Sequence, residues 1–344
     1  PAEVEALRRE LGQRFAALAS VLARRVAEGW LREGHGDLHL GNLVQWQGQP
    51  LAFDAIEFDA GLRRMDVAAD LAFTFMDLMV HGLPRLAWRL AGAWAERLGD
   101  FEGVTLLRAF GAYRAIVRAK VALLSGGDTE GFRRYWAVAR DLSAVPPAPK
   151  LVLCMGVSGS GKSTVAQRLA PSLGALRLRS DVERKRLHGL APTDRPADPA
   201  RLYSSEATRR TYERLGAVAR MALCGGVSVV VDAASLRQAE RETMRALACD
   251  ARARFALVVC TAPEPVLRER LASRWREGRD PSDATGAVLD LQMRVQEPWP
   301  ADWARWVHVV ANAGDVAQLE ATVDALATAL NGDPGGPPAV TIGP

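Results

Sequence analysis

"LVLCMGVSGSGKSTVAQRL", residues 151–169, is the stretch that decides the fold of this chain of 344 residues. It opens with the apolar run 151–155, continues with a segment that contains three glycines, and ends with helical spacing of apolar residues. Such a pattern predicts a buried strand, a tight glycine-rich turn and a helix that starts directly after the turn. Lys162 stands at the start of that helix, and it is one of only four lysines among 44 basic residues.

Residues 156–163 fit the pattern G-x-x-x-x-G-K-[ST], the Walker A motif or P-loop, in the strand–loop–helix context that the motif requires. Glycines let the backbone curl so that successive N–H groups face an anion, and the helix dipole adds to this. We expect Lys162 to reach the β- and γ-phosphates of ATP, Ser163 to ligate Mg²⁺, and Thr164 to contact the α-phosphate region. The loop residues expected around the phosphates are Gly156, Ser158, Gly159, Ser160 and Gly161. The alternative is a glycine-rich turn without a ligand, which this context disfavours.

The composition is that of a soluble globular protein, with 49% hydrophobic and 24% charged residues. A net charge of +4 is too small for a nucleic-acid coat. Cys154, Cys224, Cys249 and Cys260 form no CxxC pair, which favours buried free thiols in a reducing cytoplasm. No apolar run is long enough for a membrane span, so we expect a cytoplasmic protein with a small-molecule partner and no membrane partner.

A proline-rich connector, "AVPPAPK" at 144–150, divides the chain into two predicted domains, 1–143 and 151–330. The first is expected to be mainly helical, with a helix over 2–33 and a hairpin over 42–59 that turns at a Gly-Gln-Pro sequence. Further helices are expected from 64 to about 142. Glycine, proline and aspartate break them at 82–84, 99–100 and 126–128.

The second predicted domain alternates apolar runs with helical patterns, which indicates an α/β fold with a parallel sheet covered by helices on both faces. The expected strands are 151–156, 175–179, 227–232, 255–260 and 306–310. The tail, 331–344, is rich in proline and glycine and is expected to be disordered.

Residues 150–330 resemble the small P-loop kinases, which include polynucleotide, gluconate and shikimate kinases and zeta-toxin relatives. In "RSDVERKRL" the resemblance makes Asp181 the carboxylate that accepts the proton of an attacking hydroxyl, at a sheet edge where substrates dock. Arg184, one turn later, would hold the substrate or orient Asp181. An N-cap role is the alternative for Asp181. In "VSVVVDAAS", Asp232 resembles the acid that binds Mg²⁺ through water, and a structural role is the alternative.

The stretch "VLRERLASRWREGRDPSDA", residues 266–284, is similar to the mobile lid of these kinases. Five arginines lie on it: Arg268, Arg270, Arg274, Arg276 and Arg279. In the family such a lid brings arginines onto the transferring phosphoryl group. Arg270 and Arg274, one helical turn apart, are the two that we expect to contact phosphate.

The upstream stretch "HGDLHLGN" places Asp37 five residues before Asn42, the D-x-x-x-x-N spacing of a kinase catalytic loop. Asp54 follows at a strand end, like the metal-binding acid of that fold. Residues 1–143 thus resemble the carboxyl lobe of aminoglycoside phosphotransferases, with Asp37 as base and Asn42 and Asp54 as Mg²⁺ ligands. The whole chain resembles bifunctional proteins that join such a lobe to an AAA-type ATP-binding domain. No lysine precedes Lys120, so the amino lobe is expected to be missing from this sequence.

These features predict an ATP- and Mg²⁺-dependent kinase that phosphorylates a hydroxyl of a small polar molecule. A 5′-hydroxyl polynucleotide kinase and a non-catalytic, nucleotide-gated regulatory module are the two alternatives. The tryptophans of "EPWPADWARW" could stack on bases, although packing between helix and sheet is the stronger interpretation. The sequence identifies neither the acceptor nor the oligomeric state.

Overall fold

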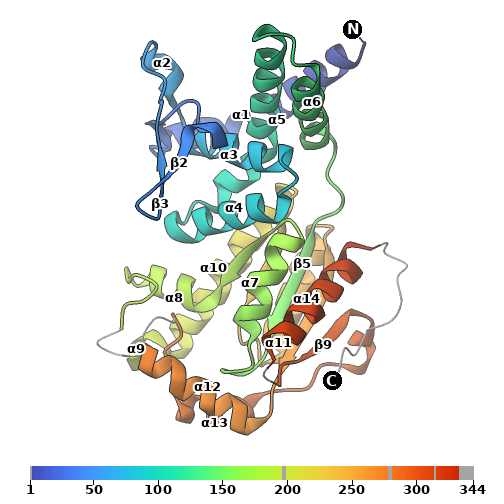
Figure 1. The fold of residues 1–344 in the computed structure, drawn as a ribbon. Helices are drawn as coiled ribbons and strands as arrows, with labels where there is room; N and C mark the ends of the chain where they lie inside the picture. Colours follow the sequence, from blue (N-terminus) through green and yellow to red (C-terminus); the bar gives the residue numbers. More distant parts are fainter. Residues whose placement is uncertain (1, 196–198, 278–280, 314, 333–344) are drawn as a thin grey trace. The chain divides into compact units, whose positions relative to one another are not determined.

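The computed structural model describes residues 2–195, 199–277, 281–313 and 315–332 (Figure 1). The chain divides into two compact units, Pro1–Pro146 and Pro147–Pro344. The tail expected to be disordered lies outside the described residues from 333 onward. Within the described part of the chain, no helix has an apolar stretch long enough to cross a membrane.

The first unit is built mainly from helices. Its elements are α1 (Ala2–Ala27), β1 (Leu31–Glu33), the 3-10 helix η1 (Leu40–Asn42), β2 (Leu43–Trp46), β3 (Gln49–Ala52), α2 (Ala60–Arg63), β4 (Arg64–Asp66), α3 (Val67–Val80), α4 (Pro84–Leu98), α5 (Phe101–Leu124) and α6 (Thr129–Ser143). The predicted first helix is too long, because α1 stops at Ala27 and the chain turns at Gly29, whose φ is +81°. The segment after it pairs as β1 with β4 in an antiparallel ribbon.

The breaks between the later helices lie where the sequence predicts them. Asp66, Asp100 and Asp128 each accept a hydrogen bond from a backbone N–H in the first turn of α3, α5 and α6, as N-caps do. Pro84 occupies the first turn of α4, where its missing N–H costs nothing. The helices bury an apolar core that includes Phe73 and Leu107.

The hairpin forms, but its turn lies earlier than predicted. Gln47 and Gly48 both have positive φ, +48° and +76°, while Gln49 and Pro50 already belong to β3. Two successive residues with positive φ form the tight turn whose twist matches that of antiparallel strands. Pro50 fits at this place because a two-stranded ribbon consists of edge strands only.

The second unit is an α/β domain with a parallel sheet of five strands in the order β6-β7-β5-β8-β9. The strands are β5 (Lys150–Met155), β6 (Ala175–Arg179), β7 (Ser228–Asp232), β8 (Arg254–Thr261) and β9 (Val307–Ala311). The helical elements are α7 (Lys162–Ser172), α8 (Ser180–Leu187), α9 (Pro199–Leu202), α10 (Ser205–Cys224), α11 (Gln238–Asp250), α12 (Glu264–Glu277), α13 (Gly286–Val295), η2 (Ala301–Trp306) and α14 (Val316–Asn331). All five predicted strands and the predicted fold class are confirmed.

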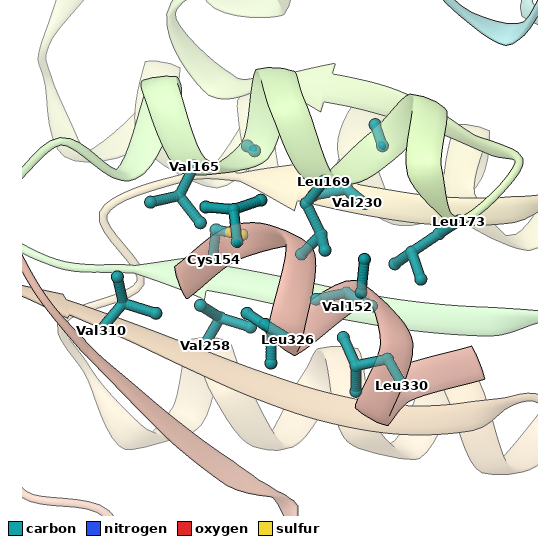
Figure 2. Packing of buried hydrophobic residues seen from close by; sticks show 14 of the residues in the cluster. Val152, Cys154, Val165, Leu169, Leu173, Val230, Val258, Val310, Leu326 and Leu330 are labelled. Atoms are coloured by element: carbon teal, nitrogen blue, oxygen red, sulfur yellow. The ribbon is translucent and has the colours of Figure 1, made fainter. Parts of the chain in front are cut away.

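The sheet buries both of its faces. Figure 2 shows Val152 and Val258 of the sheet packed against Leu169 of α7 and Leu326 of α14. The alternate residues of β5, such as Leu153, point to the opposite face, where α10 and α11 cover the sheet (Figure 1). This two-sided burial explains why the strands are nearly continuous apolar runs.

The cysteines are all free thiols, as predicted, but only two of them are buried. Cys154 and Cys260 lie inside the sheet core, where burial raises the pKa of the Cys260 thiol to about 12. Cys224 and Cys249 are exposed near helix ends. The prediction of buried thiols is therefore wrong for these two, because each cysteine lies on the exposed side of its helix, next to the buried residues Leu223 and Ala248.

Candidate nucleotide and acceptor site

The P-loop lies between β5 and α7, as the sequence predicts. Gly156, Gly159 and Gly161 have φ values of +149°, +88° and +86°, which side-chain-bearing residues rarely adopt. Gly161 is the N-cap of α7, so the helix begins at Lys162 and its first N–H groups point toward the loop. Ser158 and Ser160 are buried in the loop, whereas Thr164 on the first turn of α7 is exposed.

Two side chains hold the outer surface of the loop. The Arg270 guanidinium donates to the Gly159 carbonyl at 3.1 Å and to Asn312 Oδ1 at 3.0 Å. Asn312 in turn donates through Nδ2 to the Ser160 carbonyl at 3.2 Å. These two carbonyls are bonded on the outer side of the loop. The Ser158 N–H is bonded to Gln292 Oε1 and the Ser160 N–H to the Val157 carbonyl, so the N–H groups at the start of α7 are the ones left to face a ligand. Sequence reasoning missed Asn312, and its position one residue after β9 was the available signal.

Ser163 and Asp232, the two predicted Mg²⁺ ligands of the second unit, lie in contact. Ser163 Oγ donates to Asp232 Oδ1 at 3.2 Å, and Asp232 Oδ2 is buried without a hydrogen bond, 3.8 Å from Arg179 Nε. An orphaned carboxylate oxygen beside a hydroxyl is the oxygen donor set that Mg²⁺ prefers. These residues therefore fit the divalent ion that a P-loop nucleotide brings. Within the described residues, no three His, Cys, Asp or Glu side chains gather into a further metal cluster.

Asp181 lies at the start of α8, directly after β6. Arg179 occupies the N-cap position, so the alternative that Asp181 caps the helix through its side chain is wrong. Burial raises the pKa of Asp181, and the positive charges of Lys162 and Arg184 act in the opposite direction. Asp181 lies two residues after Arg179, whose β-sheet partner is Asp232, so it is at the same edge of the sheet as the Ser163–Asp232 pair.

Arg184 has partners on three sides. It donates to the Leu202 carbonyl at 3.3 Å and to Thr208 Oγ1 at 3.1 Å, and its guanidinium lies 5.0 Å from the ring centre of Tyr203. Burial and the nearby charges of Asp181 and Asp283 raise the pKa of Tyr203. Arg184 thus ties α8, which carries Asp181, to α9 and α10. Tyr203 was missed because a lone tyrosine between two helical patterns gives no sequence signal.

The predicted lid, residues 266–284, covers most of α12 and the segment after it, and α13 follows at Gly286. Arg268 pairs with Glu264 and, at 2.6 Å, with Asp290, while Arg276 donates to the Ala272 carbonyl of its own helix. Arg270 of α12 donates a hydrogen bond to the Gly159 carbonyl of the P-loop. Arg274, one helical turn later, is half-buried. Arg279 lies outside the described residues. Among the lid arginines that the structure describes, Arg270 thus forms a hydrogen bond with the P-loop.

The upstream motif of the first unit forms a closed loop. Asn42 donates to the Asp37 carbonyl at 3.0 Å, and Asp70 accepts the N–H groups of His35 and Gly36 at 2.8 and 3.0 Å. The hydrogen bond from His39 holds the pKa of the Asp37 carboxyl below its usual range. Asp37 and Asn42 are therefore brought together.

Asp54 is exposed, after the end of β3, in a left-handed conformation with φ of +59°. Left-handed backbone is uncommon for residues other than glycine, asparagine and aspartate. His35 Nε2 and the Phe53 carbonyl lie 2.8 Å apart, which ties the segment before Asp54 to the loop of Asp37.

The tryptophan cluster is a packing feature. Trp303 is only 3% exposed and meets Trp306 edge to face at 5.9 Å, with Phe255 of β8 against both. Trp303 therefore offers no open face for a base to stack on.

Residues 151–299 match a protein-family model described as AAA domain. An uncharacterized protein of Mycobacterium tuberculosis is 30% identical over 285 residues, which make up 81% of this chain and 57% of that protein. An uncharacterized protein of Mycobacterium bovis matches with the same figures. This chain thus spans little more than half the length of the curated relatives it matches.

Two solved structures illustrate the structural likeness. A putative kinase from Chloroflexus aurantiacus is 24% identical with a TM-score of 0.43, and the match covers 53% of this chain and 98% of that one. A gluconokinase from Sinorhizobium meliloti is 23% identical with a TM-score of 0.39, covering 54% and 95%. The segment of this chain that matches the AAA domain, residues 151–299, is the one that contains the P-loop, Asp181 and Asp232.

Proposed function

We propose that the second unit is an ATP- and Mg²⁺-dependent phosphotransferase whose acceptor is a hydroxyl group of a small polar molecule. One observation carries this proposal. Asp181 lies two residues after the end of β6, next to the strand end where Asp232 of β7 accepts a hydrogen bond from Ser163 of the P-loop. This arrangement supports a candidate base beside the phosphate-binding loop, which a nucleotide holder without transfer chemistry does not need.

The proposed reaction assigns a role to each group. The amides of the P-loop and Lys162 hold the β- and γ-phosphates and stabilise the charge that develops on them. Mg²⁺, held by Ser163 and Asp232, supplies neutralising positive charge when it is bound. The acceptor oxygen forms a bond to the γ-phosphorus while the bond to the β-γ bridging oxygen breaks and ADP leaves. Asp181 takes the proton of the acceptor hydroxyl.

The surroundings of Asp181 support this role. A general base works best when its pKa approaches the working pH, and burial moves the pKa of Asp181 in that direction. The positive charge of Lys162 acts on the pKa of Asp181 in the opposite direction. The same lysine would align the γ-phosphate.

The lid arginines are proposed as phosphate contacts. Arg270 already anchors the P-loop through the Gly159 carbonyl, and Arg274 is half-buried one turn further along α12. A guanidinium here would stabilise the oxygens of the transferring group and, with the lid closed, would act in a site without bulk water.

For the first unit, we propose a lobe like the carboxyl lobe of aminoglycoside phosphotransferases, in which Asp37 is the base and Asn42 and Asp54 are Mg²⁺ ligands. The hydrogen bond between Asn42 and Asp37 and the two amides held by Asp70 support it. In this lobe the positive charges of Arg118 and Arg114 also act on Asp37, which would suit an anionic or phosphorylated ligand.

The test is ATP consumption and ³²P transfer measured against panels of sugars, aminoglycosides, nucleosides and oligonucleotides. Lys162→Ala is the blank, and Asp181→Ala should keep ATP binding and lose transfer. Transfer to oligonucleotides alone, with a steep salt dependence, would favour a polynucleotide kinase. Tight ATP binding without transfer to any panel would reject the phosphotransferase in favour of a regulatory nucleotide module.

A further inference from the structure

We infer that Asp283 and Gln292 are positioning residues that couple the nucleotide loop to the acceptor side of the site. Both lie in residues 281–295, here called the bridging segment, which comprises a loop and α13. One end of the bridging segment contacts α8, which carries Asp181, and the other contacts the P-loop. The catalytic consequence rests on the proposed function, whereas the mechanical coupling does not.

The acceptor end of the bridging segment is Asp283, whose side chain is only 8% exposed. Lys185 Nζ lies 3.2 Å from its carboxylate, the Tyr203 hydroxyl donates to it at 3.3 Å, and Arg195 also pairs with it. These donors come from three separate places: α8, the loop after α8, and the residue directly after α9. Asp283 therefore holds together the elements that surround Asp181.

The burial of Lys185 makes its ion pair with Asp283 difficult to break. Its side chain is buried, and its other hydrogen bonds go to the neutral carbonyls of Pro192 at 3.2 Å and Asp194 at 2.8 Å. Removing one partner of a buried ion pair leaves the other charge desolvated, so the pair holds its two elements together. Asp283 supplies negative charge to this ammonium, so α8 and the bridging segment move together.

The donor end of the bridging segment is Gln292 on α13. Its Oε1 accepts the backbone N–H of Ser158 in the P-loop at 2.7 Å. Leu289 on the same helix is fully buried in an apolar cluster with Val157 of the loop and with Leu267 of α12. A loop amide and a loop side chain are thus both fastened to α13, so the loop cannot rearrange without moving the helix.

The two contacts give a continuous path. A nucleotide that reorders the P-loop amides changes the position of Gln292, and α13 carries that change to Asp283 and through Lys185 to α8. Tyr203 lies at the end of the path, because the charges of both Asp181 and Asp283 raise its pKa. Loading of the donor site would therefore set the geometry of Asp181 before an acceptor is engaged.

The experiment is amide hydrogen exchange of the full chain with and without Mg·AMPPNP. In the wild type, we expect the nucleotide to protect the P-loop and also α8. Asp283→Asn and Gln292→Leu should keep protection of the P-loop and lose the added protection of α8. The matched control is Asp290→Asn, which removes an exposed acid of α13 that pairs with Arg268 and should behave as the wild type.

A second readout separates positioning from simple structural support. Nucleotide affinity in Asp283→Asn should stay within about twofold of the wild type, while kcat with an acceptor found by screening should fall about 10- to 100-fold. Asp283→Glu, which keeps the charge, should recover much of the loss. A purely structural residue would instead raise exchange throughout the unit before nucleotide is added.

The inference is overturned if nucleotide still protects α8 in both variants, or if wild-type α8 does not respond to nucleotide at all. Failure of the proposed function would give a different set of results. A wild type that binds Mg·AMPPNP and protects α8 but transfers phosphate to no acceptor leaves the coupling in place and removes the phosphotransferase.

Discussion

The Ser163 hydroxyl donates to the Asp232 carboxylate at 3.2 Å and so joins the first turn of α7 to the end of β7. The second carboxylate oxygen of Asp232 is buried without a hydrogen bond. Arg179 Nε lies 3.8 Å from this oxygen, and a cation or its bound water would give it a direct partner. The relationship between these two residues therefore fits a divalent ion at the candidate nucleotide site.

We expect Asp232→Asn to raise the Mg²⁺ concentration for half-maximal nucleotide binding about 10- to 100-fold, the usual effect of losing a supporting carboxylate. The check is a titration of a fluorescent ATP analogue with MgCl₂. Asp250→Asn, which removes an exposed acid at the end of α11, is the control and should leave the titration unchanged. Equal Mg²⁺ dependence in both variants would remove Asp232 from the metal site.

Asp181→Asn should raise stability at neutral pH. Burial raises the pKa of Asp181 above its ordinary value of 3.8, so the folded chain binds more protons than the unfolded chain between the two pKa values. The stability of the wild type is consequently full below 3.8 and declines as the pH rises through the folded pKa. The check is urea unfolding over a pH series. The free energy of unfolding of the variant should exceed that of the wild type above the ordinary carboxyl pKa, and the difference should vanish at acid pH.

The same residue sets a limit on catalysis. If Asp181 is the base, transfer should fall as acid protonates it, and the midpoint of that fall should lie above the ordinary carboxyl value. A pH profile of kcat with excess ATP measures it. An acid limb that is unchanged in Asp181→Asn, with turnover retained, would assign the proton transfer to another group.

Gly161→Ala tests the packing of the P-loop. Its φ of +86° disfavours a side chain, and an added Cβ would overlap the side-chain amide of Asn312. Gly189 is a matched control, because its φ of +70° imposes a similar backbone strain in open space. We expect about 1–2 kcal/mol of lost stability from Gly189→Ala. Gly161→Ala should cost more and also abolish nucleotide binding, as measured by denaturation and fluorescence titration.

The sequence predicted the sheet and the P-loop well because their signals are local. An apolar run such as 151–155 can hardly be anything but a buried strand, and Gly161 followed by Lys162 needs no distant partner to form the loop. Asp232 is the last residue of β7 and Asp181 lies two residues after the end of β6, so the parallel sheet brings them to one edge.

The residues that sequence reasoning missed are fixed by contacts over long distances in the chain. Asn312 reaches Ser160 across 152 positions, Gln292 reaches Ser158 across 134, and Asp283 reaches Lys185 across 98. No periodicity or local motif marks such pairs. The turn of the hairpin was misplaced because of local signals. Gly48 and Pro50 are both typical turn residues, and Pro50 belongs to the strand β3.

Arg25 is fully buried in the first unit. Its Nε donates to Asp66 at 2.7 Å and its Nη1 to Asp100 at 2.6 Å, so one guanidinium links α1 to the caps of α3 and α5. Arg25→Ala leaves two carboxylates without their cation and should cost about 3–5 kcal/mol.

Arg24 is the matched control, because it is the adjacent residue, is half-exposed and pairs with Glu102 at the surface. Arg24→Ala should cost less than about 1 kcal/mol, as exposed ion pairs usually do. Thermal unfolding of both variants, monitored with nucleotide binding, makes the comparison. We expect Arg25→Ala to unfold the first unit early while binding of Mg·ATP by the second persists. Equal losses in the two variants would mean that the buried guanidinium contributes no more than a surface pair.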